Sequence, residues 1–330
     1  GYLPEDEVHT LYFGGGTPSY LEWEDLKRVV ATLEANYSFV PGAERTIELN
    51  PEDLTEEKLR GIRDLGFNRL SIGVQSFSDE QLKRINRTHS AQQAREGIEL
   101  AANMGFDNIS MDLIIGLPGQ TEGELLDDVE KASRLPIAHL SVYMLSIDSN
   151  TVFEHMVKRG EFRLEDEEVM AERYQRVCER LKESGFEHYE ISNFARNGRY
   201  SRHNTSYWQQ KPYIGFGPSA HSYDLHSRQW NTANLKVYID HLDKGMLSFE
   251  REELASVDLY NEYVMTSLRT MWGMEKQKLE GDYAVFWKQV QEQVRKYESS
   301  GDLIEERGRW KISEAGWVIS DTILSDLFVV

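Results

Sequence analysis

The chain has 330 residues, of which 40% are hydrophobic and 28% are charged, a balance typical of a globular protein. Its 37 Lys and Arg residues stand against 56 Asp and Glu residues, and the resulting net charge of −19 argues against a nucleic-acid partner. No stretch approaches the roughly 18 uninterrupted apolar residues of a membrane span, and no signal-peptide pattern is present. We therefore expect a protein without a membrane span that works in the cytoplasm.

The first half of the chain alternates short β-branched or apolar runs with helical patterns. The runs predict strands over residues 8–13, 46–50, 69–75, 108–116 and 139–145. Helices are predicted between them, for example over residues 23–37, 57–66 and 91–105. Several runs look apolar on both faces, which is typical of strands covered by helices on one side and by packed side chains on the other. This rhythm of βα units predicts an α/β fold, in first place a full or partial barrel and in second place an open doubly wound sheet.

The second half of the chain predicts a change of architecture. A helical pattern over residues 170–185 contains the single cysteine, Cys178, which we interpret as an ordinary helix thiol and not as a disulfide or metal ligand. Residues 199–223 are aromatic and glycine-rich, and we expect them to be irregular. A helix is predicted from about Leu254, and residues 298–328 predict a helix, a two-stranded wing and a final helix. We divide the chain into a first domain over residues 1–240 and a small, mostly helical, winged-helix-like domain over residues 241–330.

A glycine-rich loop, GGGTPS at residues 14–19, follows the first predicted strand. Consecutive residues without side chains let a ligand approach the backbone N–H and C=O groups closely, which favours a ligand-binding loop. A tight turn into the next helix, capped by Ser19, is the alternative. The loop is neither a dinucleotide fingerprint nor a P-loop, because the G-x-G-x-x-G spacing and a following GK[ST] are absent.

Polar residues close the other predicted strands. Glu48 and Asn50 end the second strand, Gln75 ends the third, and Asp112 lies in the fourth, before a turn at residues 116–118. In a barrel, binding and catalytic residues collect where the strands end and the following loops begin. We therefore expect these residues to share one edge of the sheet with the glycine-rich loop.

Four motifs extend this pattern, in order, over residues 10–121: YFGGGTPSYL, ELNPEDLT, RLSIGVQSFSDEQLKRINRTHS and NISMDLIIGLPGQT. Together they resemble the core of radical S-adenosylmethionine (SAM) proteins of the oxygen-independent coproporphyrinogen III oxidase family, in particular its heme chaperone branch. The resemblance implies a partial (β/α)6 TIM-like radical SAM barrel. It also implies S-adenosyl-L-methionine and a [4Fe–4S] cluster as cofactors, and an electron donor protein as a partner.

The resemblance implies that seven residues bind S-adenosyl-L-methionine: Gly15, Gly16, Thr17, Glu48, Gln75, Arg87 and Asp112. In the family, the glycine-rich loop holds the amino and carboxylate ends of the methionine, and a carboxylate matching Glu48 serves the ribose hydroxyls. Such chemistry suits the cofactor, because acidic groups bind hydroxyls and positive charge while a guanidinium binds a carboxylate. Taken one at a time, the two acids could equally be structural carboxylates, Gln75 could satisfy loop backbone groups, and Arg87 could be a solvated cation.

The cysteines that bind the cluster are not in this sequence. The resemblance implies three cysteines of a C-x3-C-x2-C loop, because thiolates are the soft ligands that such clusters use. Cys178 cannot replace that loop, and we expect the cysteines upstream of Gly1, where the chain enters a strand without a methionine start. As printed, the chain is expected neither to assemble the cluster nor to cleave S-adenosyl-L-methionine.

A second motif, HNTSYW at residues 203–208, resembles the H-N-x-x-Y-W stretch typical of the heme chaperone branch. An imidazole beside aromatic residues can bind heme axially, which makes His203 a candidate heme ligand. The alternative is a loop histidine satisfied by its neighbours, and we interpret His221 and the remaining histidines as structural or solvated. A heme chaperone would carry heme as cargo and have a heme-accepting protein as partner.

Three functions are open at this point. The first is a heme chaperone that holds heme and passes it to a target. The second is an enzyme that oxidatively decarboxylates two propionates of coproporphyrinogen III to give protoporphyrinogen IX. The third is a lyase that binds a divalent metal through Glu48, Asp112, His139 and Glu190, whose spacing matches no defined ligand motif. We favour the chaperone, because HNTSYW is present and the part of the chain after the barrel is compact.

Overall fold

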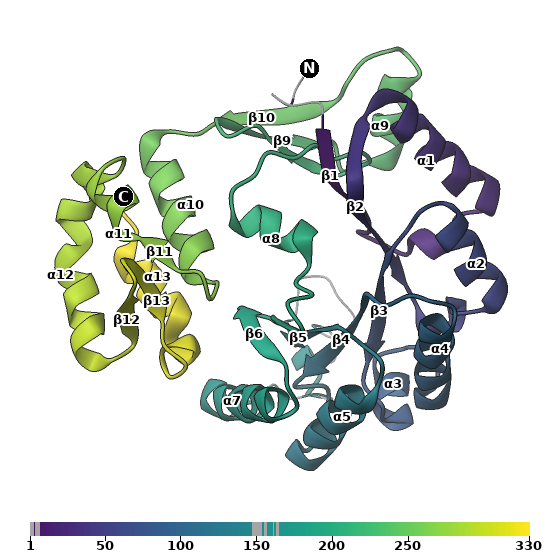
Figure 1. Ribbon diagram of the computed structural model, residues 1–330, viewed down its shortest axis with the longest axis horizontal. Helices are drawn as coiled ribbons and strands as arrows, with labels where there is room; N and C mark the ends of the chain where they lie inside the picture. The colour runs from purple at the N-terminus through teal and green to yellow at the C-terminus, as the bar shows by residue number, and fades with distance from the viewer. Residues whose placement is uncertain (1–2, 4–6, 147–153, 155–156, 161, 163–164) are drawn as a thin grey trace. The chain divides into compact units, whose positions relative to one another are not determined.

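The computed structural model describes residue 3 and residues 7–146, 154, 157–160, 162 and 165–330 (Figure 1). By its internal contacts the chain separates into two compact units, Glu7–His203 and Asn204–Val330. Our division of the chain at residue 240 is a different one, and it stays a prediction.

The first unit is built on a seven-stranded sheet with the order β1-β2-β3-β4-β5-β7-β6 in the described part of the chain. Its strands are β1 (Glu7–Phe13), β2 (Ser38–Leu49), β3 (Arg69–Gln75), β4 (Ile109–Ile115), β5 (His139–Met144), β6 (Glu187–Glu190) and β7 (Asn193–Ala195). Strands β1 to β5 pair in parallel and in sequence, whereas β7 is antiparallel to both β5 and β6. Sequential order and a curled sheet (Figure 1) confirm the predicted partial barrel and exclude the doubly wound alternative.

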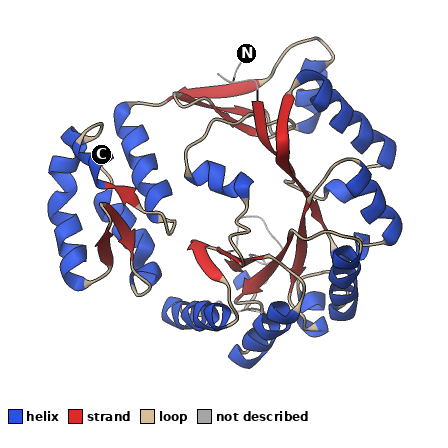
Figure 2. Cartoon of the chain, in the orientation of Figure 1, coloured by secondary structure: helices blue, strands red, loops and turns tan. Residues whose placement is uncertain are grey.

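Helices cover the convex side of this sheet (Figure 2). The helices of the unit are α1 (Trp23–Asn36), α2 (Glu56–Asp64), α3 (Asp79–Arg84), α4 (Ala91–Asn103), α5 (Glu122–Arg134) and α7 (Glu167–Glu183), with the short 3-10 turns η1 (Pro18–Tyr20) and η2 (Pro51–Asp53). Short polar residues fix where two of the helices begin, because Ser90 and Thr121 form capping boxes with Gln93 and Glu124. In the described part of the chain, no helix is long and apolar enough to cross a membrane.

The two faces of the barrel strands differ in polarity. The face toward the helices is apolar, and its buried side chains include Ile47, Leu70, Ile72, Met111 and Leu140, which form one core with residues of α1, α2, α4, α5 and α7. Because side chains alternate along a strand, the residues between these point to the concave face. There the side chains include Thr10, Thr46, Glu48, Arg69, Ser110, Asp112, His139 and Ser141.

The prediction that several strands are apolar on both faces is therefore wrong. The concave face is buried at its base but polar, with Ser110 and His139 each 1% exposed. Such groups stay buried because they bond one another: the Ser110 Oγ lies 2.7 Å from the His139 Nδ1, and the His139 Nε2 lies 2.7 Å from the Tyr189 hydroxyl. Exposure rises toward the carboxyl end of β5, where Tyr143 is 44% exposed, so the concave face opens to solvent at that edge.

The second unit contains two small antiparallel sheets in its described residues. One has the order β10-β9-β8, from β8 (His221–Tyr223), β9 (Ser227–Asn231) and β10 (Phe249–Glu253). A helix, α8 (Arg202–Trp208), precedes this sheet, and α9 (Leu235–Leu242) lies between β9 and β10 in the chain. The prediction that residues 199–223 are irregular is thus wrong for α8 and β8, although the segments between them are loops.

The C-terminal part of this unit has its own hydrophobic core, which includes Tyr260, Leu268, Val294 and Trp310. Its elements are α10 (Ser256–Leu268), β11 (Met274–Glu275), α11 (Lys276–Glu280), α12 (Ala284–Ser300), β12 (Leu303–Glu306), β13 (Arg309–Ile312), η3 (Gly316–Ile319) and α13 (Ser320–Leu327). The predicted order of a helix, a two-stranded wing and a final helix is confirmed. A short third strand, β11, pairs with β13.

Replacing Ile72 with alanine should destabilise the first unit, because this side chain is 0% exposed in the core between β3 and the helices. The lost methylene groups and the cavity should lower the free energy of unfolding by about 2–5 kcal/mol in urea denaturation. The control is Val29→Ala on α1, where the side chain is 42% exposed and a change within about 0.5 kcal/mol is expected. Equal losses in both variants would contradict the placement of this core.

Candidate functional site

The glycine-rich loop is tied to β1 and β2 through Glu48. The Tyr12 hydroxyl donates to the Glu48 Oε1 at 2.6 Å, and the Gly15 N–H donates to the Oε2 at 3.2 Å. A Cβ on Gly14 would lie 2.4 Å from the Tyr12 ring and 2.6 Å from the Glu48 Oε1, so glycine alone fits there. Gly15 has a φ of 80°, which favours glycine as well. One carboxylate thus fixes both the strand-end tyrosine and the loop.

In the remainder of the loop, Gly16 has open space around it and Thr17 is hydrogen-bonded to the following turn. Space around the α-carbon of Gly16 is open, and the Thr17 carbonyl accepts the Tyr20 N–H at 2.9 Å as η1 begins. The Ser19 hydroxyl donates to the Asp53 Oδ2 at 2.6 Å, and the N-cap of α1 is Glu22, without a side-chain cap. The alternative of a turn capped by Ser19 is therefore wrong, and the serine instead joins the loop after β1 to the loop after β2.

Asn50, Gln75 and Arg87 converge at the ends of β2 and β3. The Arg87 Nη1 donates to the Asn50 Oδ1 at 3.2 Å. A Cβ placed on Gly73 would lie 2.9 Å from the Gln75 Nε2, 3.9 Å from the Asn50 Oδ1 and 4.0 Å from the Arg87 Nη1. Gln75 itself adopts a φ of 71°, a left-handed conformation that turns the chain sharply at the strand end. Two amides and a guanidinium therefore gather at the ends of β2 and β3.

The charges of Glu48 and Arg87 act on the carboxyl group of Asp112. Burial raises its pKa to about 7, the charge of Glu48 adds to the rise, and the Ser141 hydrogen bond together with Arg69 and Arg87 opposes it. Burial and the Glu48 carboxylate likewise raise the pKa of the Tyr12 hydroxyl. The structure thus brings the predicted strand-end residues together at one edge, as expected from parallel strands.

Two residues of this site were missed in the sequence. Tyr12 and Ser141 contact the predicted acids, yet neither lies in a loop or in a cluster of charged residues. The signal that could have found them is the period of two along each strand, because Tyr12 follows Thr10 on the concave face of β1 and Ser141 pairs with Asp112 across β4 and β5. Polar side chains at that period mark a strand with a polar inner face.

His203 lies against the same strand as Tyr12. Its Nδ1 is 2.9 Å from the Thr10 Oγ1, and its ring stacks on the Tyr12 ring with centroids 4.7 Å apart and an interplanar angle of 17°. Glu44, on β2, accepts the backbone N–H of Arg202 at 3.1 Å and that of His203 at 2.9 Å. Burial lowers the pKa of the imidazole to about 4, so the ring is neutral at physiological pH. The histidine is thus held in position from a helix and not from a loop.

The four side chains of the lyase hypothesis do not form a metal site. His139 contacts Ser110 through one ring nitrogen and Tyr189 through the other, so a metal would have to displace one of these bonds. No group of three or more His, Cys, Asp or Glu side chains in the described residues could hold a metal ion, which removes the ligand set of the lyase hypothesis. Cys178, partly buried on α7, is the single cysteine of the sequence, so these residues do not fit an iron–sulfur cluster.

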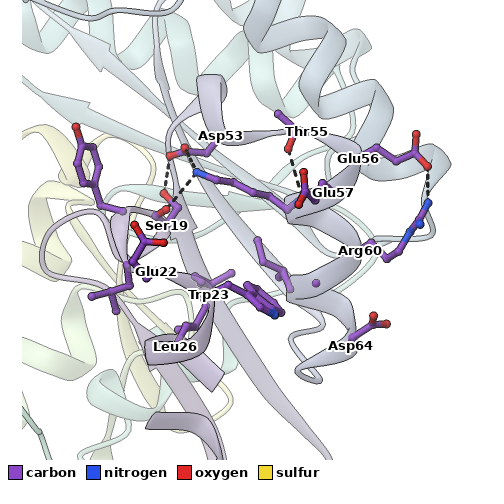
Figure 3. A pocket seen from close by; sticks show the side chains of 16 residues that line it. Ser19, Glu22, Trp23, Leu26, Asp53, Thr55, Glu56, Glu57, Arg60 and Asp64 are labelled. Carbon is purple, nitrogen blue, oxygen red and sulfur yellow. Dashed lines mark hydrogen bonds and ion pairs between the residues drawn. The ribbon is translucent and has the colours of Figure 1, made fainter. Parts of the chain in front are cut away.

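A separate pocket of about 940 Å³ lies between η1, α1 and α2 (Figure 3). Trp23 and Asp64 line it, whereas none of the predicted cofactor or heme residues does. At one end Lys58 donates to Asp53 and, at 3.2 Å, to the carbonyl oxygen of Ser19. The carboxyl edge of the sheet that carries Glu48, Gln75 and Asp112 is called the polar edge below. The pocket lies outside it, and the hydrogen bonds of Lys58 hold Ser19 at the end of the glycine-rich loop.

Comparisons with known proteins agree with this geometry. The pattern of the radical SAM superfamily matches residues 2–132. The heme chaperone HemW of Bacillus subtilis is 37% identical over 283 residues, which cover 84% of this chain and 74% of that protein. HemW of Lactococcus lactis is 32% identical over 319 residues, which cover 96% and 84% respectively. The chain belongs to the HemW heme chaperone family.

The HemW family also has relatives outside bacteria. The mitochondrial radical S-adenosyl methionine domain-containing protein 1 of Bos taurus is 32% identical over 343 residues, with 97% of this chain and 75% of that protein covered. Among solved structures, coproporphyrinogen III oxidase (HemN) from Escherichia coli superimposes with a TM-score of 0.82 over 97% of this chain and 78% of its own, at 23% identity. The HemW member described here therefore shares the radical SAM barrel fold of HemN.

Replacing Asp112 with asparagine should change how stability depends on pH. The pKa of Asp112 is about 7 in the folded protein, against about 3.9 for an aspartate in an unfolded chain. Between these values the folded protein keeps a proton that the unfolded chain releases, so the contribution of Asp112 to the free energy of unfolding falls as the pH rises. We expect Asp112→Asn to gain stability relative to the parent protein between about pH 5 and pH 8 in urea denaturation. A difference that is the same at both pH values would contradict the assignment.

Proposed function

We propose that this protein binds heme and passes it to an acceptor protein. Membership of the HemW family carries the proposal, because curated relatives named heme chaperones are 28–37% identical to this chain. The motif HNTSYW supports it, since its first residue is an imidazole held by contacts within the barrel unit. The acceptor protein and a cytoplasmic location stay predictions from the sequence.

His203 is the residue that we propose as an axial ligand of the heme iron. Iron binds the neutral form of imidazole, and the low pKa of this side chain keeps that form above about pH 4. Because Thr10 contacts the Nδ1, binding of the iron through the Nε2 would leave that contact intact. The stack on Tyr12 and the bond from the His203 backbone to Glu44 restrict the ring and its helix, which lowers the entropy lost on binding.

The polar edge of the barrel suits S-adenosyl-L-methionine in its chemistry. The open space at Gly15 and Gly16 leaves room for a head group beside backbone N–H groups and the Thr17 hydroxyl. Glu48 supplies carboxylate oxygens for ribose hydroxyls and already orders the loop. We propose the further contacts at Gln75, Arg87 and Asp112, which face the same edge.

Bound S-adenosyl-L-methionine would supply a sulfonium centre, and the residues of this chain would orient it and hold its polar ends. Membership of the radical SAM superfamily implies a [4Fe–4S] cluster beside this cofactor, and the electron donor protein stays a prediction from the sequence. No cluster ligand set exists among the described residues, and we assign no reaction step to the cluster.

Oxygen-independent coproporphyrinogen III oxidase activity is the second candidate. Its support is the likeness to HemN, which at 23% identity concerns the fold alone. Relatives of higher identity carry the chaperone name, so we rank the oxidase below the chaperone.

The proposal is tested on the protein with its native N-terminus, reconstituted anaerobically with iron and sulfide, by titrating it with hemin while the Soret band is followed and assaying turnover of coproporphyrinogen III in parallel. We expect stoichiometric heme binding without decarboxylation. Decarboxylation of coproporphyrinogen III would support the oxidase in its place, and absence of heme binding would contradict the chaperone function.

Replacing His203 with alanine should weaken heme binding and shift the Soret band, because the proposed axial nitrogen is lost. We expect an increase in the dissociation constant of about tenfold or more. The matched control is His221→Ala, an exposed histidine of β8 that should leave the titration unchanged. If His203→Ala binds heme with the parent affinity and spectrum, the ligand assignment is wrong.

Replacing Glu48 with glutamine should weaken S-adenosyl-L-methionine binding. The change removes a charged acceptor worth about 1.5–3 kcal/mol, which corresponds to a loss of about 10- to 100-fold in affinity. Equilibrium dialysis of the cofactor measures the loss, and Glu22→Gln beside α1 serves as the control at an exposed carboxylate. Unchanged affinity in Glu48→Gln would argue that this edge binds another molecule.

A further inference from the structure

A second, smaller pocket lies within the second unit, and the last two residues of the HNTSYW motif help to line it. Its volume is about 210 Å³, and four aromatic residues help to line it, namely Tyr207, Trp208, Tyr213 and Tyr223. We call it the aromatic pocket. Because Tyr207 and Trp208 belong to the same motif as His203, the sequence that supplies the proposed iron ligand also supplies part of this wall.

Contacts between rings and between backbones restrain the aromatic wall of this pocket. Tyr207 and Tyr213 meet edge to face with ring centroids 4.7 Å apart. The backbones of Tyr213 and Tyr223 exchange two hydrogen bonds of 2.9 Å, which fixes one tyrosine against the other. Such a wall offers flat apolar surface at little entropic cost, as suits one edge of a planar conjugated ring.

The polar side of the aromatic pocket carries an excess of positive charge. Lys211 and Arg228 line it together with one carboxylate, Glu262, in a protein whose formal net charge is −19. An Arg228 Nη2 pairs with the Glu262 Oε1 at 2.8 Å, and the arginine side chain is still 37% exposed. A guanidinium has five N–H donors, so this ion pair leaves it able to bind a second carboxylate. Lys211 is exposed beside it.

We propose that the aromatic pocket receives one edge of the tetrapyrrole and that Arg228 and Lys211 bind a propionate carboxylate on that edge. This inference rests on the proposed heme-binding function and names the part of heme that the aromatic pocket recognises. The pocket is smaller than the 300–1,000 Å³ typical of sites that enclose a whole ligand, which fits an edge and not the entire macrocycle. The apolar wall faces the ring, and the cations face the carboxylate.

The proposal predicts that the protein distinguishes hemin from hemin dimethyl ester, whose propionates carry no charge. We expect the parent protein to prefer the free acid by about 10- to 100-fold, as follows from one charge-assisted hydrogen bond to a carboxylate. Soret titrations with the two compounds measure this preference. Equal affinities of the parent protein for both compounds would overturn the proposal while leaving heme binding intact.

Two variants assign the preference to the pocket. Lys211→Met and Arg228→Met should each reduce the preference for the free acid several-fold, whereas Lys244→Met, an exposed lysine after α9, should leave it unchanged. Since Arg228→Met leaves Glu262 without its cation and could unfold the pocket, Arg228→Lys, which keeps the charge, should retain part of the preference. Unchanged preferences in both methionine variants would overturn the assignment.

The His203→Ala variant separates this inference from the proposed function. It should weaken the binding of hemin and of its ester equally, so that the ratio of the two affinities stays at the parent value. A parent protein that binds neither compound would instead contradict the heme chaperone function itself. An altered ratio in His203→Ala would mean that the carboxylate is recognised beside the iron ligand and would overturn the role of the aromatic pocket.

Discussion

The two hydrogen bonds accepted by Glu48 determine the geometry of the polar edge. One oxygen takes the Tyr12 hydroxyl and the other takes the Gly15 N–H, so a strand and a loop share a single carboxylate. Tyr12 in turn provides the surface on which the His203 ring stacks. The proposed cofactor loop and the proposed iron ligand are therefore adjacent to the same aromatic ring, and the position of each depends on that ring.

A polar concave face makes this arrangement possible. In a closed barrel, apolar side chains fill the interior, whereas here the helices cover one face of the sheet and hydrogen-bonded polar groups occupy the other. The base of that face is sealed by bonded pairs such as Ser110 and His139, and the carboxyl edge is open. The sheet can thus present acids and amides to a polar ligand without leaving deep charges unpaired.

How much of the fold and of the candidate site could be predicted depends on how far apart in the sequence the interacting residues lie. The barrel and the shared edge of Glu48, Gln75 and Asp112 were predictable, because the order of parallel strands places their carboxyl ends together. The polar inner face was misinterpreted, since short runs such as NISMDLIIG contain enough apolar residues to hide the alternation. Helix α8 was missed because its seven residues carry no apolar period, and what stabilises its start lies on β2.

Helix α8 is held at its start by a residue that lies far away in the sequence. Glu44 accepts the N–H groups of Arg202 and His203, which lie 158 and 159 residues later in the chain. A helix of seven residues is too short to persist by itself in water, and an acidic group at its N-terminus compensates the exposed N–H groups and the helix dipole. The start of helix α8 therefore depends on β2, and the His203 imidazole is preorganised by the folded barrel and not by its own helix.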